Sequence, residues 1–166
     1  MLPKKPKIKP SKSGDEALAS LMRLCARAER SSGDARRLMH RWGVDRQEQE
    51  RVLQRLIAER FIDDRRYTEA FIREKTSLSA WGEYKIRAAL QNKGIASQII
   101  TEALAACDSL KGSSRLEEKL RHKLRSVKYE SLYQLKGKLL RYAASLGYAM
   151  DEAMEAVEAV LSQMEK

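Results

Sequence analysis

Proline is missing from almost all of this 166-residue chain, because its three prolines lie at Pro3, Pro6 and Pro10. Proline breaks helices, since its ring clashes with the preceding turn and its nitrogen has no hydrogen to donate. The rest of the chain is rich in Ala, Leu, Arg, Glu and Lys, which favour helix. The sequence therefore predicts an all-α fold.

Cysteine and histidine are also scarce, with two residues of each. Cys25 and Cys107 fall on apolar faces of predicted helices, which favours reduced core residues in a cytoplasmic protein. His40 and His122 lie far apart among basic residues, so no Cys or His cluster has the spacing of a metal site. Phosphate-binding glycine loops and nucleophile motifs are missing as well. We expect a protein that is not an enzyme and that carries no metal or cofactor.

Long hydrophobic runs are absent too. No apolar stretch approaches the ~20 residues that a membrane-spanning helix requires. Residues 1–14 are rich in Lys, Pro and Ser and lack the apolar centre of a secretory signal. This composition predicts a basic, disordered tail on a cytoplasmic protein that does not use a membrane.

Three glycines reveal a repeat. Gly43, Gly94 and Gly147 each follow a helix-like run, precede an apolar residue and lead into a second amphipathic run. Their spacing of about 50 residues is typical of tandem copies of one helical unit. Glycine is favoured just past a helix end because it adopts positive φ without steric cost. Gly33 and Gly137, each ten residues before such a glycine, support the same register.

This register predicts three tandem three-helix repeats that stack into an elongated, curved array. We expect the tail at residues 1–14, followed by repeats at residues 15–62, 63–110 and 111–166. Ten residues beyond each marker glycine lie equivalent core positions, at Leu53, Leu104 and Val157.

Helical spacing also predicts which side chains are buried. In the third helix of the first repeat, the predicted inward residues are Val52, Leu53, Leu56 and Ile57. The first helix of the second repeat should bury Tyr67, Ala70, Phe71 and Leu78. Ser97 is placed to cap the third helix of that repeat.

The net charge of +10 is unevenly distributed. The first 12 residues contain five lysines and no acid, and residues 111–141 contain ten basic and three acidic residues. Basic side chains also recur on the second helix of every repeat. These candidate nucleic-acid or filament-binding residues are Arg36, Arg37, Arg41, Lys85, Arg87, Lys93, Lys136, Lys138 and Arg141. They predict a discontinuous basic stripe for a polyanionic partner, although solvated amphipathic helices would give the same pattern.

Aromatic residues make up only 6% of the chain. Trp42, Phe61, Tyr67 and Phe71 lie beside the predicted apolar stripes, which favours packing. Trp81 and Tyr84 remain candidates for stacking on nucleic-acid bases.

Two segments, AERFIDDRRYTEAFIREK at residues 58–75 and KIRAALQNKGI at residues 85–95, resemble the RecX family of RecA regulators. The matching motifs are the apolar-Asp-Asp-x-Arg-Tyr pattern from Phe61 to Tyr67 and the Lys-Ile-to-Lys-Gly-Ile pattern from Lys85 to Ile95. The resemblance extends through residues 15–166. It is strongest in the second repeat and weakest in the third.

The resemblance implies a mostly monomeric protein that binds RecA–single-stranded DNA filaments in their helical groove. It also implies inhibition of strand exchange, of filament ATP hydrolysis and of RecA-dependent repressor cleavage, as well as some direct binding to bare DNA. The family supplies no catalytic residues to carry over.

Two other functions remain open at this point. The chain could be a tri-helical transcription regulator that acts directly on duplex DNA, although such proteins place one recognition helix in a groove and usually dimerise. It could also be a scaffold whose basic stripe serves only to solvate it.

Overall fold

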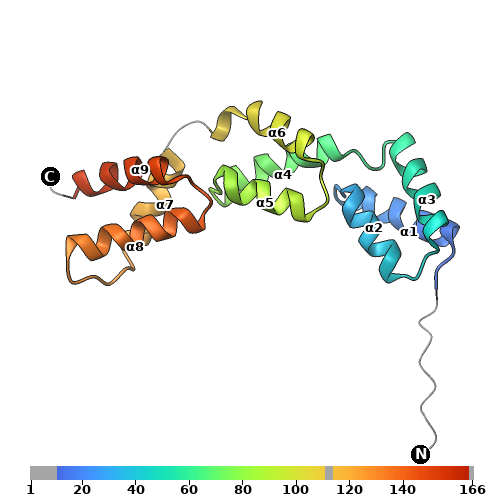
Figure 1. Cartoon of the computed structure of the whole chain (residues 1–166), viewed down its shortest axis with the longest axis horizontal. Helices are drawn as coiled ribbons and strands as arrows, with labels where there is room; N and C mark the ends of the chain where they lie inside the picture. The colour runs from blue at the N-terminus through green and yellow to red at the C-terminus, as the bar shows by residue number, and fades with distance from the viewer. Residues whose placement is uncertain (1–10, 111–113, 165–166) are drawn as a thin grey trace, which may run out of the picture. The chain divides into compact units, whose positions relative to one another are not determined.

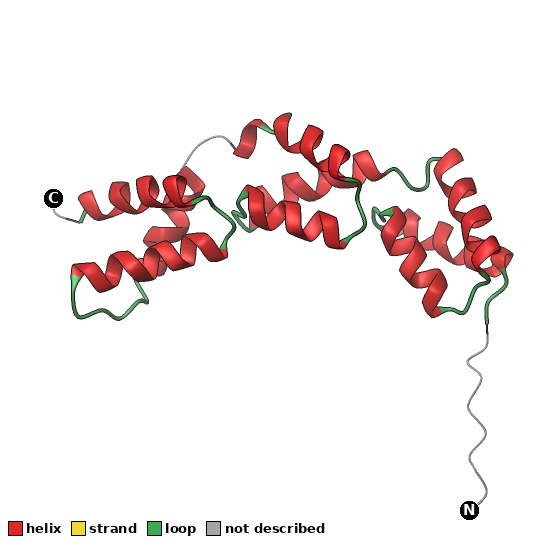
Figure 2. Ribbon diagram, in the orientation of Figure 1, coloured by secondary structure: helices red, strands yellow, loops and turns green. Residues whose placement is uncertain are grey.

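The computed structural model describes residues 11–110 and 114–164, which contain nine α-helices, one 3-10 turn and no strand (Figures 1 and 2). The first three helices are α1 (Gly14–Arg27), α2 (Ser32–Arg41) and α3 (Arg46–Ala58). The next three are α4 (Asp64–Leu78), α5 (Glu83–Asn92) and α6 (Ser97–Ala105), followed by the 3-10 turn η1 (Asp108–Leu110). The last three are α7 (Ser114–Leu124), α8 (Leu132–Ser145) and α9 (Met150–Ser162). The all-α prediction is confirmed.

The chain divides into two compact units. The first runs up to Tyr67 and includes Lys93–Ile95, and the second contains Thr68–Asn92 and the chain from Ala96 onward. The turn after α5 thus belongs to the first unit, whereas α5 itself belongs to the second. The predicted repeat boundaries remain predictions, and the one between residues 110 and 111 lies at the edge of a segment outside the described residues.

The start of the described chain is more ordered than the sequence suggested. Residues 1–10 of the predicted tail lie outside the described residues, but Ser13 caps α1 and exchanges backbone and side-chain hydrogen bonds with Glu16. Lys12 donates its backbone N–H to the Trp42 carbonyl at 3.0 Å, and its ammonium lies 4.0 Å from the Trp42 ring centroid. The prediction of disorder through residue 14 is therefore wrong for Lys12, Ser13 and Gly14.

The core of the first unit follows the predicted stripes with one exception. Helices α1, α2 and α3 contribute a cluster that includes Leu21, Met39 and Leu56, all fully buried. Leu53 is buried as predicted, but Ile57 is 48% exposed. Ile57 follows Leu56 directly, and one residue turns the side chain about 100° around the helix and away from the buried stripe.

In α4 the buried face also differs from the prediction. Leu78 is 76% exposed, whereas Thr68, Ile72 and Thr76 are buried. Thr76 is tolerated inside because its hydroxyl donates to the Ile72 carbonyl one turn earlier at 2.8 Å. An apolar-residue pattern could not find this face, because two of its members are polar. Leu104 in α6 is buried, as predicted.

The third group of helices has its own core. Helices α7, α8 and α9 bury a cluster whose fully enclosed members include Leu120, Leu135, Leu139 and Val157. The matching offsets after the marker glycines are therefore confirmed as buried positions at Leu53, Leu104 and Val157.

The three marker glycines occupy equivalent places. Gly43, Gly94 and Gly147 follow the ends of α2, α5 and α8 with φ of +70°, +78° and +93°. A side chain is strained in this left-handed region, which explains the repeated glycine. Gly33 and Gly137 are not equivalent, because Gly33 lies at the start of α2 and Gly137 lies inside α8.

In the first unit, the turn at Gly94 packs on the start of α2. Ser31 Oγ, which also caps α2, donates to the Lys93 carbonyl at 3.3 Å. A Cβ added to Gly33 would lie 1.9 Å from that carbonyl oxygen, so only glycine fits there. Helix N-termini have unsatisfied N–H groups and helix C-termini have unsatisfied carbonyls, so this contact suits both ends.

The second unit contains the same kind of junction, between the end of α8 and the start of α5. The N–H of Gly82 donates to the Leu146 carbonyl at 2.7 Å, and the N–H of Tyr84 donates to the Gly147 carbonyl at 3.1 Å. A Cβ on Gly82 would lie 2.4 Å from the Gly147 oxygen. Gly82 is therefore the counterpart of Gly33.

Helix caps were only partly predictable. Asp45 caps α3 by accepting from Gln47 N–H at 3.1 Å. Ser97 does not cap α6. It is the first helical residue, and the preceding Ala96 makes no side-chain cap.

Candidate nucleic-acid interface

The nine basic candidates lie on or beside α2, α5 and α8, which are the second helices of the three predicted repeats. Arg36, Arg37 and Arg41 are on α2, Lys85 and Arg87 are on α5, Lys93 directly follows α5, and Lys136, Lys138 and Arg141 are on α8. Sequence spacing placed eight of them on the correct helix, and Lys93 is the exception, because α5 ends at Asn92. Whether the nine residues form one stripe remains a prediction.

On α2, the candidate residues have different surroundings. Arg36 forms an exposed ion pair with Glu50 of α3. Arg41 is exposed and forms no ion pair with any part of the chain that the structure describes. Exposed pairs contribute at most about 1 kcal/mol, so a phosphate group can replace Glu50 as the partner of Arg36 at small cost.

Arg37 and Lys93 meet at Asp34, at the junction of the first unit. Arg37 Nη2 lies 2.6 Å and Lys93 Nζ lies 3.3 Å from Asp34 Oδ1, and the Asp34 side chain is only 13% exposed. Burial alone would raise the pKa of this carboxyl. The hydrogen bond from Arg37 and the positive charge of Lys93 outweigh it and hold the pKa of Asp34 below its ordinary value. These two basic residues therefore stabilise the junction.

On α5, the basic side chains contact neighbouring residues. Lys85 Nζ lies 4.5 Å from the centroid of the Trp81 ring, a cation–π contact. Arg87 donates to Glu83 Oε1 at 2.9 Å and to Thr101 Oγ1 at 3.1 Å. Lys85 keeps its full charge available to a partner, since an aromatic ring does not neutralise it.

On α8, Lys136 Nζ lies 3.1 Å from Glu158 Oε1 of α9, in an exposed pair. Lys138 Nζ donates to the Lys128 carbonyl at 2.5 Å. Arg141 is exposed, and no carboxylate pairs with it among residues 11–110 and 114–164. Lys138 and Arg141 therefore both retain an uncompensated charge.

The two aromatic candidates differ in exposure. Trp81 is half-buried, in edge-on contact with Phe71 at 6.3 Å between ring centroids, and Lys75 and Lys85 both lie over it. This environment explains Trp81 as a packing residue. Tyr84 is 66% exposed at the start of α5.

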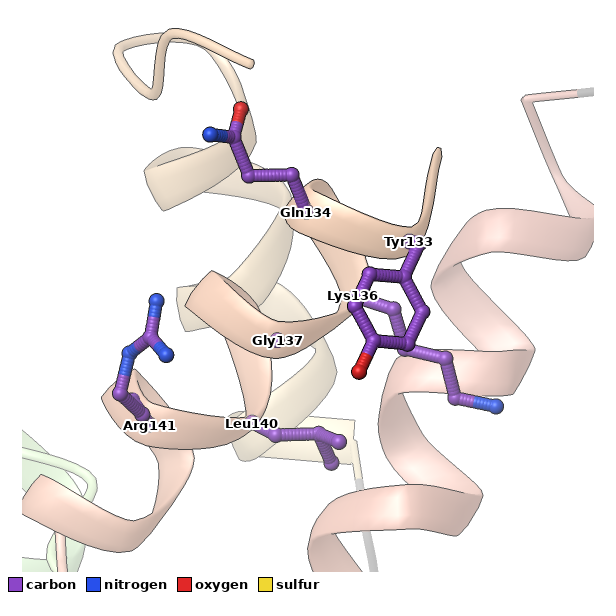
Figure 3. A pocket seen from close by; sticks show the side chains of 6 residues that line it. All are labelled: Tyr133, Gln134, Lys136, Gly137, Leu140 and Arg141. Atoms are coloured by element: carbon purple, nitrogen blue, oxygen red, sulfur yellow. The ribbon is translucent and has the colours of Figure 1, made fainter. Parts of the chain in front are cut away.

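Tyr133 of α8 is an exposed aromatic that the sequence pattern missed. Its side chain is 91% exposed, on the side of α8 opposite the buried Leu135, Leu139 and Ala143. Helical spacing could have identified it, because Tyr133 falls outside the apolar stripe of α8 and lies four residues before Gly137, on the same face of the helix. In Figure 3 the Tyr133 ring projects from the same side of α8 as Lys136, and Gly137 lies between it and Arg141.

Other kinds of site find no support in the described residues. No group of three or more His, Cys, Asp and Glu side chains in that part of the chain is placed to bind a metal ion. None of its helices has the length and apolar character needed to span a membrane. Cys25 and Cys107 are half-buried and form no disulfide within the described residues, and burial raises the pKa of the Cys25 thiol, which disfavours its reactive thiolate form.

Comparison with known proteins identifies the family. A model of the second three-helix domain of RecX matches residues 63–104. The regulatory protein RecX of Mycobacterium leprae (strain Br4923) is 32% identical over 114 residues, which cover 68% of this chain and 67% of that protein. The chain belongs to the RecX family. The regulatory protein RecX of Mycobacterium sp. (strain KMS) is 28% identical over 161 residues and covers 95% of the chain and 87% of that relative.

The fold of this RecX-family protein also matches a solved structure. The crystal structure of RecX from Lactobacillus salivarius aligns with a TM-score of 0.72 over 89% of this chain and 96% of that one, at 18% identity. This similarity supports the all-α repeat fold, and at such low identity it concerns the fold alone. The resemblance predicted from the two motifs is confirmed, and the protein is a regulator of the RecX family.

Proposed function

We propose that this RecX-family protein regulates the recombinase RecA, mainly as an inhibitor. It binds in the groove of RecA–single-stranded DNA filaments and modulates strand exchange, filament ATP hydrolysis and repressor cleavage. It acts as a cytoplasmic monomer through binding rather than catalysis and requires no cofactor. These activities would link it to homologous recombination, DNA repair and the SOS response.

One structural observation carries this proposal beyond family membership. Each of the three equivalent helices α2, α5 and α8 presents a basic side chain that pairs with no carboxylate in the described residues, at Arg41, Lys85 and Arg141 respectively. A filament built on DNA presents phosphates at regular intervals. Three repeated basic positions can therefore engage it several times, and modest individual contacts then combine into higher avidity.

The charged pairs on the same helices support the mechanism. Arg36–Glu50 and Lys136–Glu158 are exposed, so each gains little from its present partner. A phosphate can compete for these cations, and each contact releases counterions from DNA. Such contacts determine affinity and position but carry no information about base sequence.

The test compares two charge-removing variants: a second-helix variant, changed on α2, α5 and α8, and a first-helix variant, changed on α1, α4 and α7. One variant combines Arg41→Ala, Lys85→Ala and Arg141→Ala. Its matched control combines Arg23→Ala, Arg73→Ala and Lys119→Ala, on α1, α4 and α7, and has the same net charge. The readouts are ATP hydrolysis by the cognate RecA on single-stranded DNA and strand exchange at near-physiological salt.

We expect the unmodified protein and the first-helix control to slow both reactions, and the second-helix variant to lose most of this inhibition. Equal inhibition by both variants would refute the role of α2, α5 and α8. No effect of the unmodified protein would refute the RecA proposal. Tight binding to one duplex sequence would instead favour the alternative, a tri-helical transcription regulator that acts directly on duplex DNA.

A further inference from the structure

The solvent-facing side of α8 contains an open groove of about 700 Å³, which we call the α8 groove (Figure 3). It is lined by Tyr133, Gln134, Lys136, Gly137, Leu140 and Arg141. In Figure 3, Tyr133, Lys136 and Leu140 project from one side of the helix and Gln134 and Arg141 from the other. Gly137 lies between them, so the groove combines an aromatic ring, a bare stretch of helix and basic groups.

Gly137 is the first clue that the groove has a purpose. Glycine inside a helix lowers stability, because it loses more backbone freedom on folding than other residues. Nothing in the fold requires glycine here, since its φ is not positive and an added Cβ would meet only Arg141 Nη1, at an ordinary contact distance of 3.9 Å. Gly82, in contrast, has no room for a side chain. Gly137 therefore leaves a stretch of α8 without a side chain, and the packing of the fold does not require this.

Tyr133 is the second clue. It is 91% exposed, more than any other large hydrophobic side chain in the described residues. Residues four apart lie on the same face of a helix, and Tyr133 and Gly137 accordingly both line the groove. An exposed aromatic face in an open groove can hold a flat partner by stacking.

The charge around the groove selects the partner. Lys136 and Arg141 are the basic residues that line the groove, and no acidic side chain is among its described lining residues. Arg141 at one end of the groove has no carboxylate partner in the described chain, and the exposed pair of Lys136 with Glu158 can open at small cost. An aromatic ring within a basic surface is the combination by which proteins bind single-stranded nucleic acid.

We propose that the α8 groove binds single-stranded DNA, with one nucleobase stacked on Tyr133 above Gly137 and an adjacent phosphate at Arg141. This inference rests on the proposed function only for the choice of DNA as the ligand, and it adds a contact with a base to contacts with phosphates. Bases of a duplex are stacked on each other and offer no free face, so the stacking contact is specific for single strands.

The experiment measures binding by fluorescence anisotropy to three probes of equal length: oligodeoxythymidylate, an abasic single strand and a duplex. The variants of the full chain are Tyr133→Ala, Tyr133→Phe and Gly137→Leu. The control is Leu132→Ala, because Leu132 is exposed next to Tyr133 but does not line the groove. Thermal unfolding of every variant verifies that it folds.

We expect the unmodified protein to bind oligodeoxythymidylate more tightly than the abasic strand. Tyr133→Ala should weaken thymidylate binding by about 5- to 100-fold, as expected for the loss of one base–aromatic stack, and should abolish the preference over the abasic strand. Its duplex affinity and the salt dependence of binding should not change. Tyr133→Phe and Leu132→Ala should bind like the unmodified protein. Gly137→Leu should weaken thymidylate binding without a lower melting temperature, because it fills the groove and favours helix.

Several results would overturn the inference. These are an unmodified protein that binds no bare single strand or shows no preference for bases, and thymidylate binding that survives both Tyr133→Ala and Gly137→Leu. Loss of RecA inhibition in Tyr133→Ala with intact thymidylate binding would also overturn it, and would assign the groove to a protein surface. The proposed function has its own test. RecA inhibition by the second-helix and first-helix variants is measured without reference to a preference for bases.

Discussion

Gly82→Ala should destabilise the second unit strongly, although it adds a single methyl group. The new Cβ would lie 2.4 Å from the Gly147 oxygen and 2.7 Å from the Tyr148 nitrogen, and both are backbone atoms that no side-chain rotation can move aside. The turn after α8 must therefore shift, which endangers the 2.7 Å bond to the Leu146 carbonyl and the 3.1 Å bond from Tyr84. Overpacking costs about 1–3 kcal/mol, and two neutral hydrogen bonds add about 1–3 kcal/mol.

The measurement is thermal and urea unfolding followed by circular dichroism. A loss of about 2–6 kcal/mol should lower the melting temperature by at least 4 °C for a chain of this size. Gly137→Ala is the matched control, because the same chemical change occurs in open space, where it should stabilise the helix by about 0.5–1 kcal/mol. If Gly82→Ala melts like the unmodified protein, the junction between α8 and α5 is not packed as we describe.

Three further predictions concern other parts of the molecule. Leu104→Ala should cost about 2–5 kcal/mol in urea unfolding, because Leu104 is a buried core residue of α6, and an unchanged midpoint would contradict its burial. Because the pKa of Asp34 is lowered in the folded state, ionised Asp34 stabilises the fold above the ordinary aspartate pKa, and this contribution disappears as the pH falls through the lowered value. Asp34→Asn should therefore reduce stability at pH 7 and flatten its loss in acid, whereas a parallel acid profile would contradict the pairing with Arg37 and Lys93. Lys93→Ala should lower stability more than it changes the salt dependence of DNA binding, and Arg41→Ala should do the reverse, with a slope reduced by about 0.7 on single strands.

The repeat could be predicted from sequence because its markers are local. Gly43, Gly94 and Gly147 each end a helix in a backbone conformation that only glycine adopts readily, so their spacing revealed the period. The prediction that Gly33 and Gly137 are equivalent was wrong. Each lies ten residues before a marker glycine, but Gly33 is at the start of α2 and Gly137 is inside α8. Gly33 must be glycine because the Lys93 carbonyl packs against it, and this contact between residues far apart in the chain is visible only in the structure.

The inward faces were predictable where they are apolar. The α4 face was predicted only in part: Tyr67 is buried as expected, but Thr68 and Thr76 are buried as well, and the Thr76 hydroxyl donates to a carbonyl of its own helix. The predicted burial of Ile57 and Leu78 was also wrong, because both are apolar side chains that remain exposed. Most folded surfaces contain such residues, so hydrophobicity alone does not distinguish them from the core.

For the candidate interface, sequence located the basic residues but not the partners that decide their availability. The nine positions looked alike in the sequence, yet Arg37 and Lys93 are held by the largely buried Asp34, and Arg41 and Arg141 have no carboxylate partner in the described chain. This difference arises from tertiary contacts between segments that are far apart in the chain. Tyr133 was missed because its sequence neighbours do not show that its side chain is almost fully exposed.

The division between held and available charges follows from their exposure. Removing Arg37 or Lys93 from Asp34 would leave a largely buried carboxylate with less compensation, and this cost opposes any transfer of these cations to a phosphate. Arg36 and Lys136 face no such cost, because water can solvate Glu50 and Glu158 after the pairs open. The same set of basic residues therefore contains two populations, one that maintains the junction and one that can exchange partners. A polyanion such as a RecA–DNA filament would recruit the second population and leave the first in place, so binding need not weaken the fold that presents it.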